Sequence, residues 1–133
     1  IKHIFEEKGE SYFRKLESRI IQDITDDENL VISTGGGVVL DENNIANLRM
    51  NGIIFLLFGK IETIINNISK SSKERPLIVT ELECYESVRR MYEERKGLYI
   101  VYGDYIINVD HKSVSEIGDE IILIYKEHLS CGK

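Results

Sequence analysis

Residues 30–37 read LVISTGGG, an apolar run that passes directly into three consecutive glycines. Only glycine leaves no Cβ beside the backbone, and each glycine costs backbone entropy, so a triplet indicates that main chain must approach a ligand closely. In open α/β sheets, ligands bind beyond the carboxyl ends of parallel strands. We therefore expect a strand over residues 30–33, with the glycines at its ligand-binding end. A sharp strand-to-helix turn without a ligand is the alternative interpretation.

The overall composition is typical of one globular domain, with 42% hydrophobic and 30% charged residues among 133. The formal net charge of −6 argues against a general nucleic-acid binder. Cys84 and Cys131 lack metal-site spacing and predict no disulfide framework, which fits a reducing cytoplasm. The apolar run at 53–58 is far too short to cross a bilayer, so we expect no membrane partner.

Helix and strand patterns alternate along the chain. Helical spacing predicts a helix over residues 11–24, separated by Gly9 from the end of an earlier one. Asp41 and Ser113 are the predicted N-caps of two later helices, the second with Glu116 in a capping-box position. The remaining predicted elements are strands at 53–58 and 105–109 and helices at 61–68 and 81–96, the last ended by Gly97. This alternation favours an α/β fold, with a parallel sheet and helices on both of its faces.

Four motifs follow one another along the sequence: FRKLE at 13–17, TGGG at 34–37, RPL at 75–77, and Arg95 with Tyr99. In this order and at these separations they resemble shikimate kinase, a member of the nucleoside monophosphate kinase group of P-loop proteins. The resemblance extends from residue 1 to about residue 125. It implies one domain over residues 1–133, built as a three-layer α/β/α P-loop-kinase-like parallel sheet. It also implies transfer of the γ-phosphoryl group of ATP to the 3-hydroxyl of shikimate, a step toward chorismate and the aromatic amino acids.

The resemblance implies that five residues bind shikimate: Arg14, Gly35, Gly36, Gly37 and Arg95. A carboxylate is held best by planar guanidinium groups, which donate two parallel charge-assisted hydrogen bonds; lysine would keep the charge but lose this geometry. The glycines would bring backbone N–H groups against the ring hydroxyls. Glu17 lies one helical turn after Arg14 and can meet it, so we expect it to orient the guanidinium.

Arg75 is the expected catalytic residue and also an ATP contact, because the resemblance places it in a lid loop of about residues 69–80. A cation delivered by a closing loop stabilises the charge of the transferring phosphoryl group and helps to exclude water. Lys112 falls near a position that approaches adenine in the family. ATP and Mg²⁺ are the implied cofactors, and shikimate is the implied small-molecule partner of a cytoplasmic monomer.

Two features of the family are absent from these 133 residues: the G-x-x-x-x-G-K-[ST] P-loop and an Asp-x-Asp pair. We therefore expect the sequence to lack the N-terminal strand, P-loop and helix, to supply no metal ligand, and to be inactive on its own. The family's first strand would lie between residues 30–33 and 53–58, whose backbone groups would otherwise face a gap. Ile68 and Gly97 also depart from the family pattern, where relatives often carry an adenine-stacking arginine and a proline.

Simpler interpretations remain for each residue taken alone. Arg14 suits a surface helix residue paired with Glu17 or Asp23, Arg95 suits the basic end of a helix, and Arg75 suits an ordinary loop. The presence of all four motifs in the family's order favours a shikimate-binding site over these separate interpretations. Two functional alternatives also remain: a non-catalytic shikimate-kinase-like binding module, and another small-molecule kinase such as gluconate kinase. Titrations with shikimate and gluconate separate them, because only a ring carboxylate would use both Arg14 and Arg95.

Overall fold

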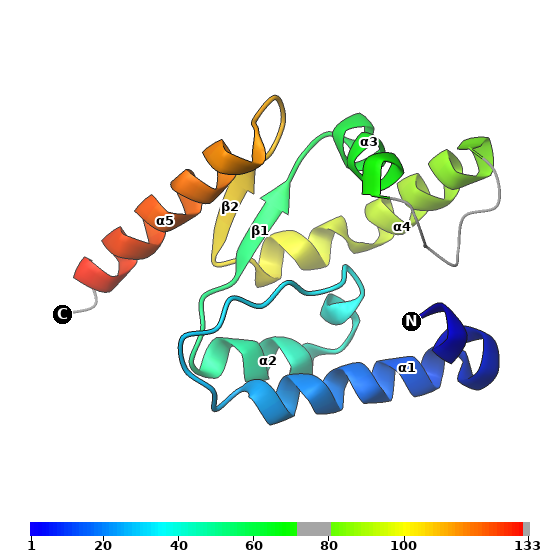
Figure 1. Cartoon of the computed structure of the whole chain (residues 1–133), viewed down its shortest axis with the longest axis horizontal. Helices are drawn as coiled ribbons and strands as arrows, with labels where there is room; N and C mark the ends of the chain where they lie inside the picture. Colours follow the sequence, from blue (N-terminus) through cyan, green and yellow to red (C-terminus); the bar gives the residue numbers. More distant parts are fainter. Residues whose placement is uncertain (72–80, 132–133) are drawn as a thin grey trace.

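Two short parallel strands, with two helices between them in sequence, organise the computed structural model, which describes residues 1–71 and 81–131 (Figure 1). Strand β1 (Phe55–Phe58) pairs in parallel with β2 (Tyr105–Asn108), placing Phe55 opposite Tyr105. The helices are α1 (Lys2–Ile24), α2 (Glu42–Met50), α3 (Ile61–Ser71), α4 (Glu81–Tyr102) and α5 (Val114–Cys131), and a 3₁₀ turn η1 spans Val38–Leu40. The predicted α/β class is confirmed. None of the described helices is long and apolar enough to span a membrane.

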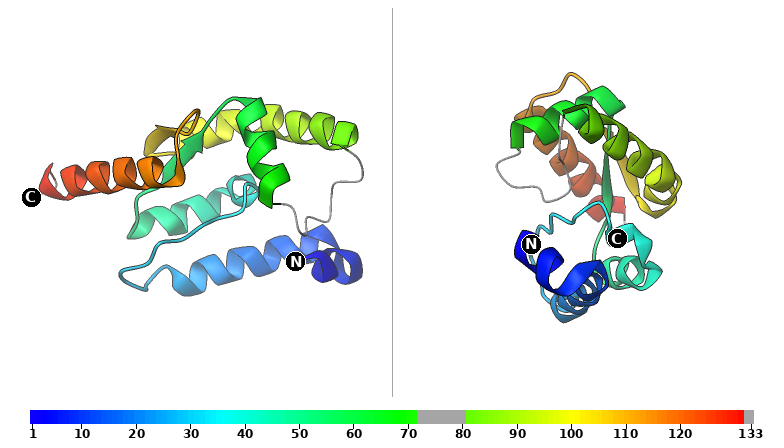
Figure 2. Two further views of the ribbon diagram at one scale, coloured as in Figure 1. Left: turned by 45° about the horizontal axis from the view of Figure 1, so that its top comes forward. Right: turned by 90° about the vertical axis from the view of Figure 1, so that its right-hand side faces the viewer.

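The main hydrophobic core lies where α1, α2, η1 and α4 meet. Helices α1 and α2 lie side by side (Figure 2), and they bury Ile21 and Ile45 against Val38 and Val39 of η1. Partly buried side chains that pack on this cluster are Leu48, Ile54, Leu98, Tyr99 and Tyr102. Because the glycine triplet directly precedes η1, the core fixes the position of the turn that carries it.

The helix break predicted at Gly9 is confirmed. Gly9 lies within α1 at φ 78° and ψ 171°, so two helical segments meet there at a kink. Glycine adopts this positive φ without the steric cost that a Cβ would impose. The kink turns the first segment back so that the Phe5 and Phe13 ring centroids lie 4.7 Å apart.

Both predicted N-caps are also confirmed. The Asp41 carboxylate accepts a 2.9 Å hydrogen bond from the Asn43 N–H at the start of α2. At the start of α5, the Ser113 hydroxyl accepts from the Glu116 N–H at 3.2 Å, and the Glu116 carboxylate accepts from the Ser113 N–H at 2.7 Å. These bonds satisfy N–H groups that a helix leaves unpaired at its first turn. The Ser113 N–H and hydroxyl also hold the pKa of Glu116 below its ordinary value.

One ion pair joins the end of α2 to the far side of the core. Arg49 donates a 2.9 Å hydrogen bond to the Tyr102 carbonyl and pairs with the Asp104 carboxylate at 3.1 Å. The second oxygen of Asp104 accepts a 2.8 Å bond from the Ile54 N–H, just before β1. Arg49 and Asp104 therefore tie together α2, the end of α4 and the start of the sheet.

The prediction of a strand over residues 30–33 is wrong. This segment has no regular secondary structure, and Leu30, Val31 and Ile32 expose 50%, 102% and 42% of their surface. A strand needs a hydrogen-bonding partner, and none of the described residues lies in a ladder with it. Leu57 of β1 is also uncovered, with 54% of its surface exposed.

Two predicted helix ends are also wrong. Helix α4 runs through Gly97 to Tyr102 rather than ending at residue 96. A glycine can be accommodated within a helix, and Leu98 and Tyr102 beyond it gain burial against the core, which outweighs its weak helix propensity. Helix α3 continues to Ser71 rather than ending at residue 68, so the first part of the predicted loop at 69–80 is helical. The rest of that loop, residues 72–80, lies outside the described residues.

Candidate functional site

The glycine turn, residues 35–37, lies between α1 and α4. Two backbone hydrogen bonds shape it, from the Val38 N–H to the Gly35 carbonyl at 3.2 Å and from the Leu40 N–H to the Gly37 carbonyl at 3.1 Å. Within the part of the chain that the structure describes, no acceptor pairs with the N–H groups of the three glycines. The N–H groups of the turn therefore have no partner among the described residues.

Arg14 of α1 lies directly against this turn. A Cβ built on Gly37 would be 2.3 Å from both terminal nitrogens of the Arg14 guanidinium. Any side chain at position 37 would therefore displace the arginine. Gly37 is itself buried, whereas Gly36 is exposed. A larger residue at position 37 is therefore incompatible with this position of the Arg14 guanidinium.

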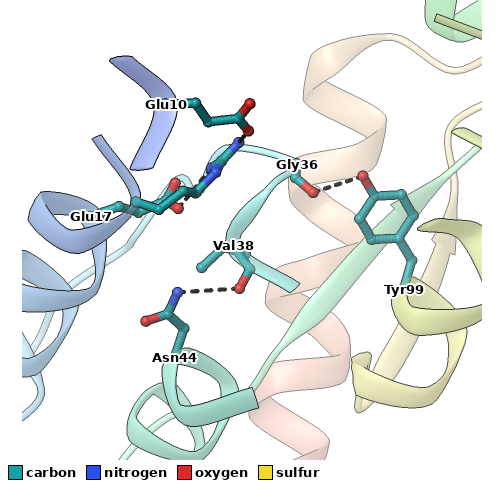
Figure 3. Close-up of polar contacts among 7 residues, drawn as sticks. Glu10, Glu17, Gly36, Val38, Asn44 and Tyr99 are labelled. Carbon is teal, nitrogen blue, oxygen red and sulfur yellow. Dashed lines mark hydrogen bonds and ion pairs between the residues drawn. The ribbon is translucent and has the colours of Figure 1, made fainter. Parts of the chain in front are cut away.

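Two carboxylates hold the Arg14 guanidinium. Nη1 donates to Glu17 at 2.8 Å and Nη2 donates to Glu10 at 3.3 Å (Figure 3). The Arg14–Glu17 contact predicted from their spacing is thus confirmed, while Glu10 is a partner that the sequence analysis missed. The guanidinium carbon also lies 5.2 Å from the centroid of the Phe13 ring. A guanidinium has five N–H donors, so these two bonds leave donors for a further acceptor.

Tyr99 of α4 reaches the glycine turn from the other side. Its hydroxyl donates a 2.8 Å hydrogen bond to the Gly36 carbonyl (Figure 3). Arg95 lies four residues before Tyr99 on the same helix, and residues four apart share one helix face. Arg95 is half-buried, and no described residue forms a hydrogen bond or ion pair with it. Arg95 and Tyr99 therefore share the helix face that meets the turn.

A pocket of about 200 Å³ adjoins the turn on the side of α1 and α2. Arg14, Gly37 and the 2% exposed Asn44 are among its lining residues. The other lining residues are Glu10, Ser18, Leu40 and Asp41. The Asn44 amide donates a 3.3 Å hydrogen bond to the Val38 carbonyl, which fixes the chain just beyond the glycines.

A second polar cluster lies at the carboxyl ends of β1 and β2. The Asp110 carboxylate accepts a 2.6 Å bond from the Thr63 hydroxyl and a 2.9 Å bond from the Lys60 N–H, which holds the start of α3. These two donors lower the pKa of Asp110 below its ordinary value. Lys112 lies two residues further on, and its ammonium group pairs with Glu120 of α5. None of the contacts among the described residues joins Lys112 to the glycine turn.

The described residues do not fit a magnesium–triphosphate site. Across residues 1–71 and 81–131, no three His, Cys, Asp or Glu side chains are grouped closely enough to hold a metal ion. The sequence also contains no P-loop motif that would cradle phosphates.

The structure thus brings Arg14 and the three predicted glycines together, and it places Arg95 one helical turn from a residue that contacts them. Arg75 lies outside the described residues. Tyr99 belongs to the fourth sequence motif, but its contact with the turn was not predicted. Its spacing of four from Arg95 was the available signal, because it puts both side chains on one helix face.

This arrangement defines an α/β protein in which a turn of bare backbone lies between an arginine of α1 and a tyrosine of α4. Residues 1–126 match the family described as Shikimate kinase. A curated shikimate kinase of Caldanaerobacter subterraneus is 44% identical over 125 residues, which cover 94% of this chain and 71% of that protein.

Solved structures agree with the sequence match. Shikimate kinase from Acinetobacter baumannii in complex with shikimate superimposes with a TM-score of 0.86 at 26% identity, covering 96% of this chain and 70% of that one. Shikimate kinase from Aquifex aeolicus gives a TM-score of 0.75 at 34% identity, covering 96% and 72%. The chain belongs to the shikimate kinase family, whose activity is the ATP-dependent phosphorylation of shikimate.

Proposed function

We propose that the glycine turn, Arg14 and Arg95 form the part of this kinase that binds shikimate. The observation that carries the proposal is the contact between the Arg14 guanidinium and Gly37, where an added Cβ would lie 2.3 Å from both terminal nitrogens. That contact puts a planar cation beside the glycine N–H groups. A carboxylate and ring hydroxyls on one small molecule match these two kinds of donor.

Each group has a separate task in this proposal. Arg14, already oriented by Glu17, donates its remaining N–H groups to the shikimate carboxylate. Arg95 supplies a second guanidinium from α4, so the carboxylate is held from two elements. The glycine N–H groups bind ring hydroxyls at close range. The shikimate-bound structure of the Acinetobacter relative, which superimposes over 96% of this chain, supports this assignment.

Calorimetric titration of shikimate into the protein tests the proposal. Arg14→Lys and Arg95→Lys keep the charge but lose the planar pair of donors, and each should weaken shikimate binding by about 10- to 100-fold, the worth of a charged hydrogen-bonded contact. Arg19→Lys and Arg90→Lys, at exposed positions of the same helices, are the matched controls and should bind normally. Unchanged affinity in the Arg14 and Arg95 variants would refute the site, and tighter binding of gluconate would refute the substrate.

We also propose that Arg75 stabilises the charge on the phosphoryl group during its transfer to the substrate, and that Lys112 contacts the nucleotide. The family uses ATP and Mg²⁺. The support for Arg75 is its place in the RPL motif at 75–77. Lys112 stands at the carboxyl edge of the sheet, where nucleotides bind in this class of fold. To reach a nucleotide its ammonium group must leave Glu120.

We further propose that one more strand, from polypeptide outside these 133 residues, lies between residues 30–33 and β1 within a single domain. The exposed side chains of Val31 and of Leu57 in β1 support this, since apolar side chains in a parallel-sheet domain are normally covered. An intact mass well above 15.3 kDa for the protein from its natural source is the expected result. A folded, soluble 15.3 kDa monomer from the cytoplasm would overturn the proposal.

A further inference from the structure

The peptide unit between Gly36 and Gly37 has a hydrogen bond at one end only. Its carbonyl accepts the 2.8 Å bond from the Tyr99 hydroxyl, while no described residue accepts from its N–H, which belongs to Gly37. A trans peptide is planar, and its C=O and N–H point in opposite directions. A bond that fixes the Gly36 carbonyl therefore also fixes the direction of the Gly37 N–H.

Glycines on both sides make this peptide unusually free to rotate. Neither neighbour has a Cβ to restrict φ and ψ, so the chain alone would allow the unit to flip. The Asn44 amide anchors the Val38 carbonyl, beyond the flexible unit. Within the turn itself, Tyr99 is the described side chain that restrains this peptide unit.

We propose that Tyr99 is a positioning residue, which orients the Gly36–Gly37 peptide so that the Gly37 N–H faces shikimate. This inference rests on the proposed function, because it names how one donor of that site is aimed. Tyr99 also joins the turn to the helix that carries Arg95. A Cβ on Gly36 would lie 2.9 Å from the Tyr99 hydroxyl oxygen, so the fit of hydroxyl to bare backbone is close.

Tyr99→Phe tests the proposal because it removes the hydroxyl and keeps the ring that packs on the core. Shikimate affinity should fall about fivefold, the effect of losing one neutral hydrogen bond. The amide signal of Gly37 in ¹⁵N–¹H spectra of the ligand-free protein should shift and broaden as the peptide becomes free to rotate. Tyr102→Phe, in the same helix and with a hydroxyl that bonds to no described residue, should change neither quantity.

The outcomes of these measurements distinguish the positioning role of Tyr99 from the proposed shikimate-binding site. An unchanged Gly37 amide in Tyr99→Phe overturns the positioning role. A shifted amide with unchanged affinity, in a protein whose Arg14→Lys variant binds weakly, also overturns it, because the peptide would then not contribute to binding. If Arg14→Lys itself binds shikimate normally, the proposed function fails instead. If Tyr99→Phe lowers the melting temperature by the same amount as Tyr102→Phe, reduced stability does not account for the weaker shikimate binding of Tyr99→Phe.

Discussion

The Arg14 guanidinium occupies the space where any side chain of residue 37 would have to lie, with both terminal nitrogens 2.3 Å from the Cβ position of Gly37. The backbone of Gly37, at φ −86° and ψ −7°, is one that alanine also adopts. The need for glycine at this position therefore comes from the arginine and not from the main chain.

Gly37→Ala should reduce shikimate affinity at least about 10-fold, because the displaced guanidinium loses its place beside the turn. The fold should change little in stability, since Arg14 is a flexible side chain and partly exposed ion pairs contribute about 0–1 kcal/mol. Calorimetric titration and thermal unfolding measure the two effects. Gly118→Ala in α5 is the matched control, because a Cβ there meets nothing within 4 Å. Equal affinity in the two variants would contradict the role of residue 37.

Gly97→Ala should stabilise the protein by about 0.5–1 kcal/mol, because Gly97 lies inside α4 and a Cβ there meets nothing within 4 Å. Gly9→Ala should do the opposite and cost about 1–3 kcal/mol, because its φ of 78° with ψ of 171° is a region that residues with a Cβ rarely adopt. Urea unfolding measures both. Destabilisation by Gly97→Ala would mean that α4 ends at residue 96 after all.

Asp110→Asn should reveal an acid-dependent contribution to stability. Thr63 and Lys60 lower the pKa of Asp110 in the folded chain, so below its ordinary value of 3.8 the unfolded chain binds more protons. The contribution is therefore fully present above that value and is lost as the pH falls through the lowered folded value. In urea unfolding, the stability gap between wild type and variant should narrow on going from pH 6 to pH 3. A gap that stays constant would contradict the prediction.

Arg49→Ala should destabilise the protein by about 1 kcal/mol, because it removes a partly exposed ion pair with Asp104 and a hydrogen bond to the Tyr102 carbonyl. Urea unfolding checks this value. Arg19→Ala, an exposed substitution on α1, should stay within about 0.5 kcal/mol of wild type. Similar values for the two variants would show that the Arg49 contacts do not hold α2 to the sheet.

Arg75→Ala should lower kcat for shikimate phosphorylation by about 100-fold, the effect of removing one group that stabilises charge in the transition state. The KM for shikimate should change little, because the proposed substrate contacts lie elsewhere. Steady-state kinetics separates the two constants. Lys73→Ala, two residues away in sequence, is the control and should retain most of its kcat. An effect on KM alone would remove Arg75 from the catalytic role.

Contacts between residues close in the sequence could be predicted, whereas contacts between residues far apart in the sequence could not. The Ser113–Glu116 capping box and the Arg14–Glu17 pair involve residues three apart, so spacing alone predicts their contact. The bond between Tyr99 and Gly36 joins residues 63 positions apart, and only the packing of α4 on the core brings them together.

The strand expected at residues 30–33 and the helix end expected at residue 96 were wrong for the same reason. Residues 30–33 have the composition of a strand, but a strand forms only where a neighbour completes its hydrogen bonds. Gly97 has the local character of a helix end, yet burial of Leu98 beyond it favours continuation. In both cases the deciding interaction lies outside the window that a local pattern covers.

The two-stranded ribbon has a practical consequence for work with this chain. Among the described residues, β1 and β2 pair only with each other, and Leu57 and Ile106 expose 54% and 51% of their surface. Uncovered strand edges flanked by apolar side chains recruit further strands from other molecules. A net charge of −6 opposes such aggregation by mutual repulsion, and added salt screens that repulsion. Concentrated samples should therefore stay clear at low ionic strength and become turbid as salt is raised.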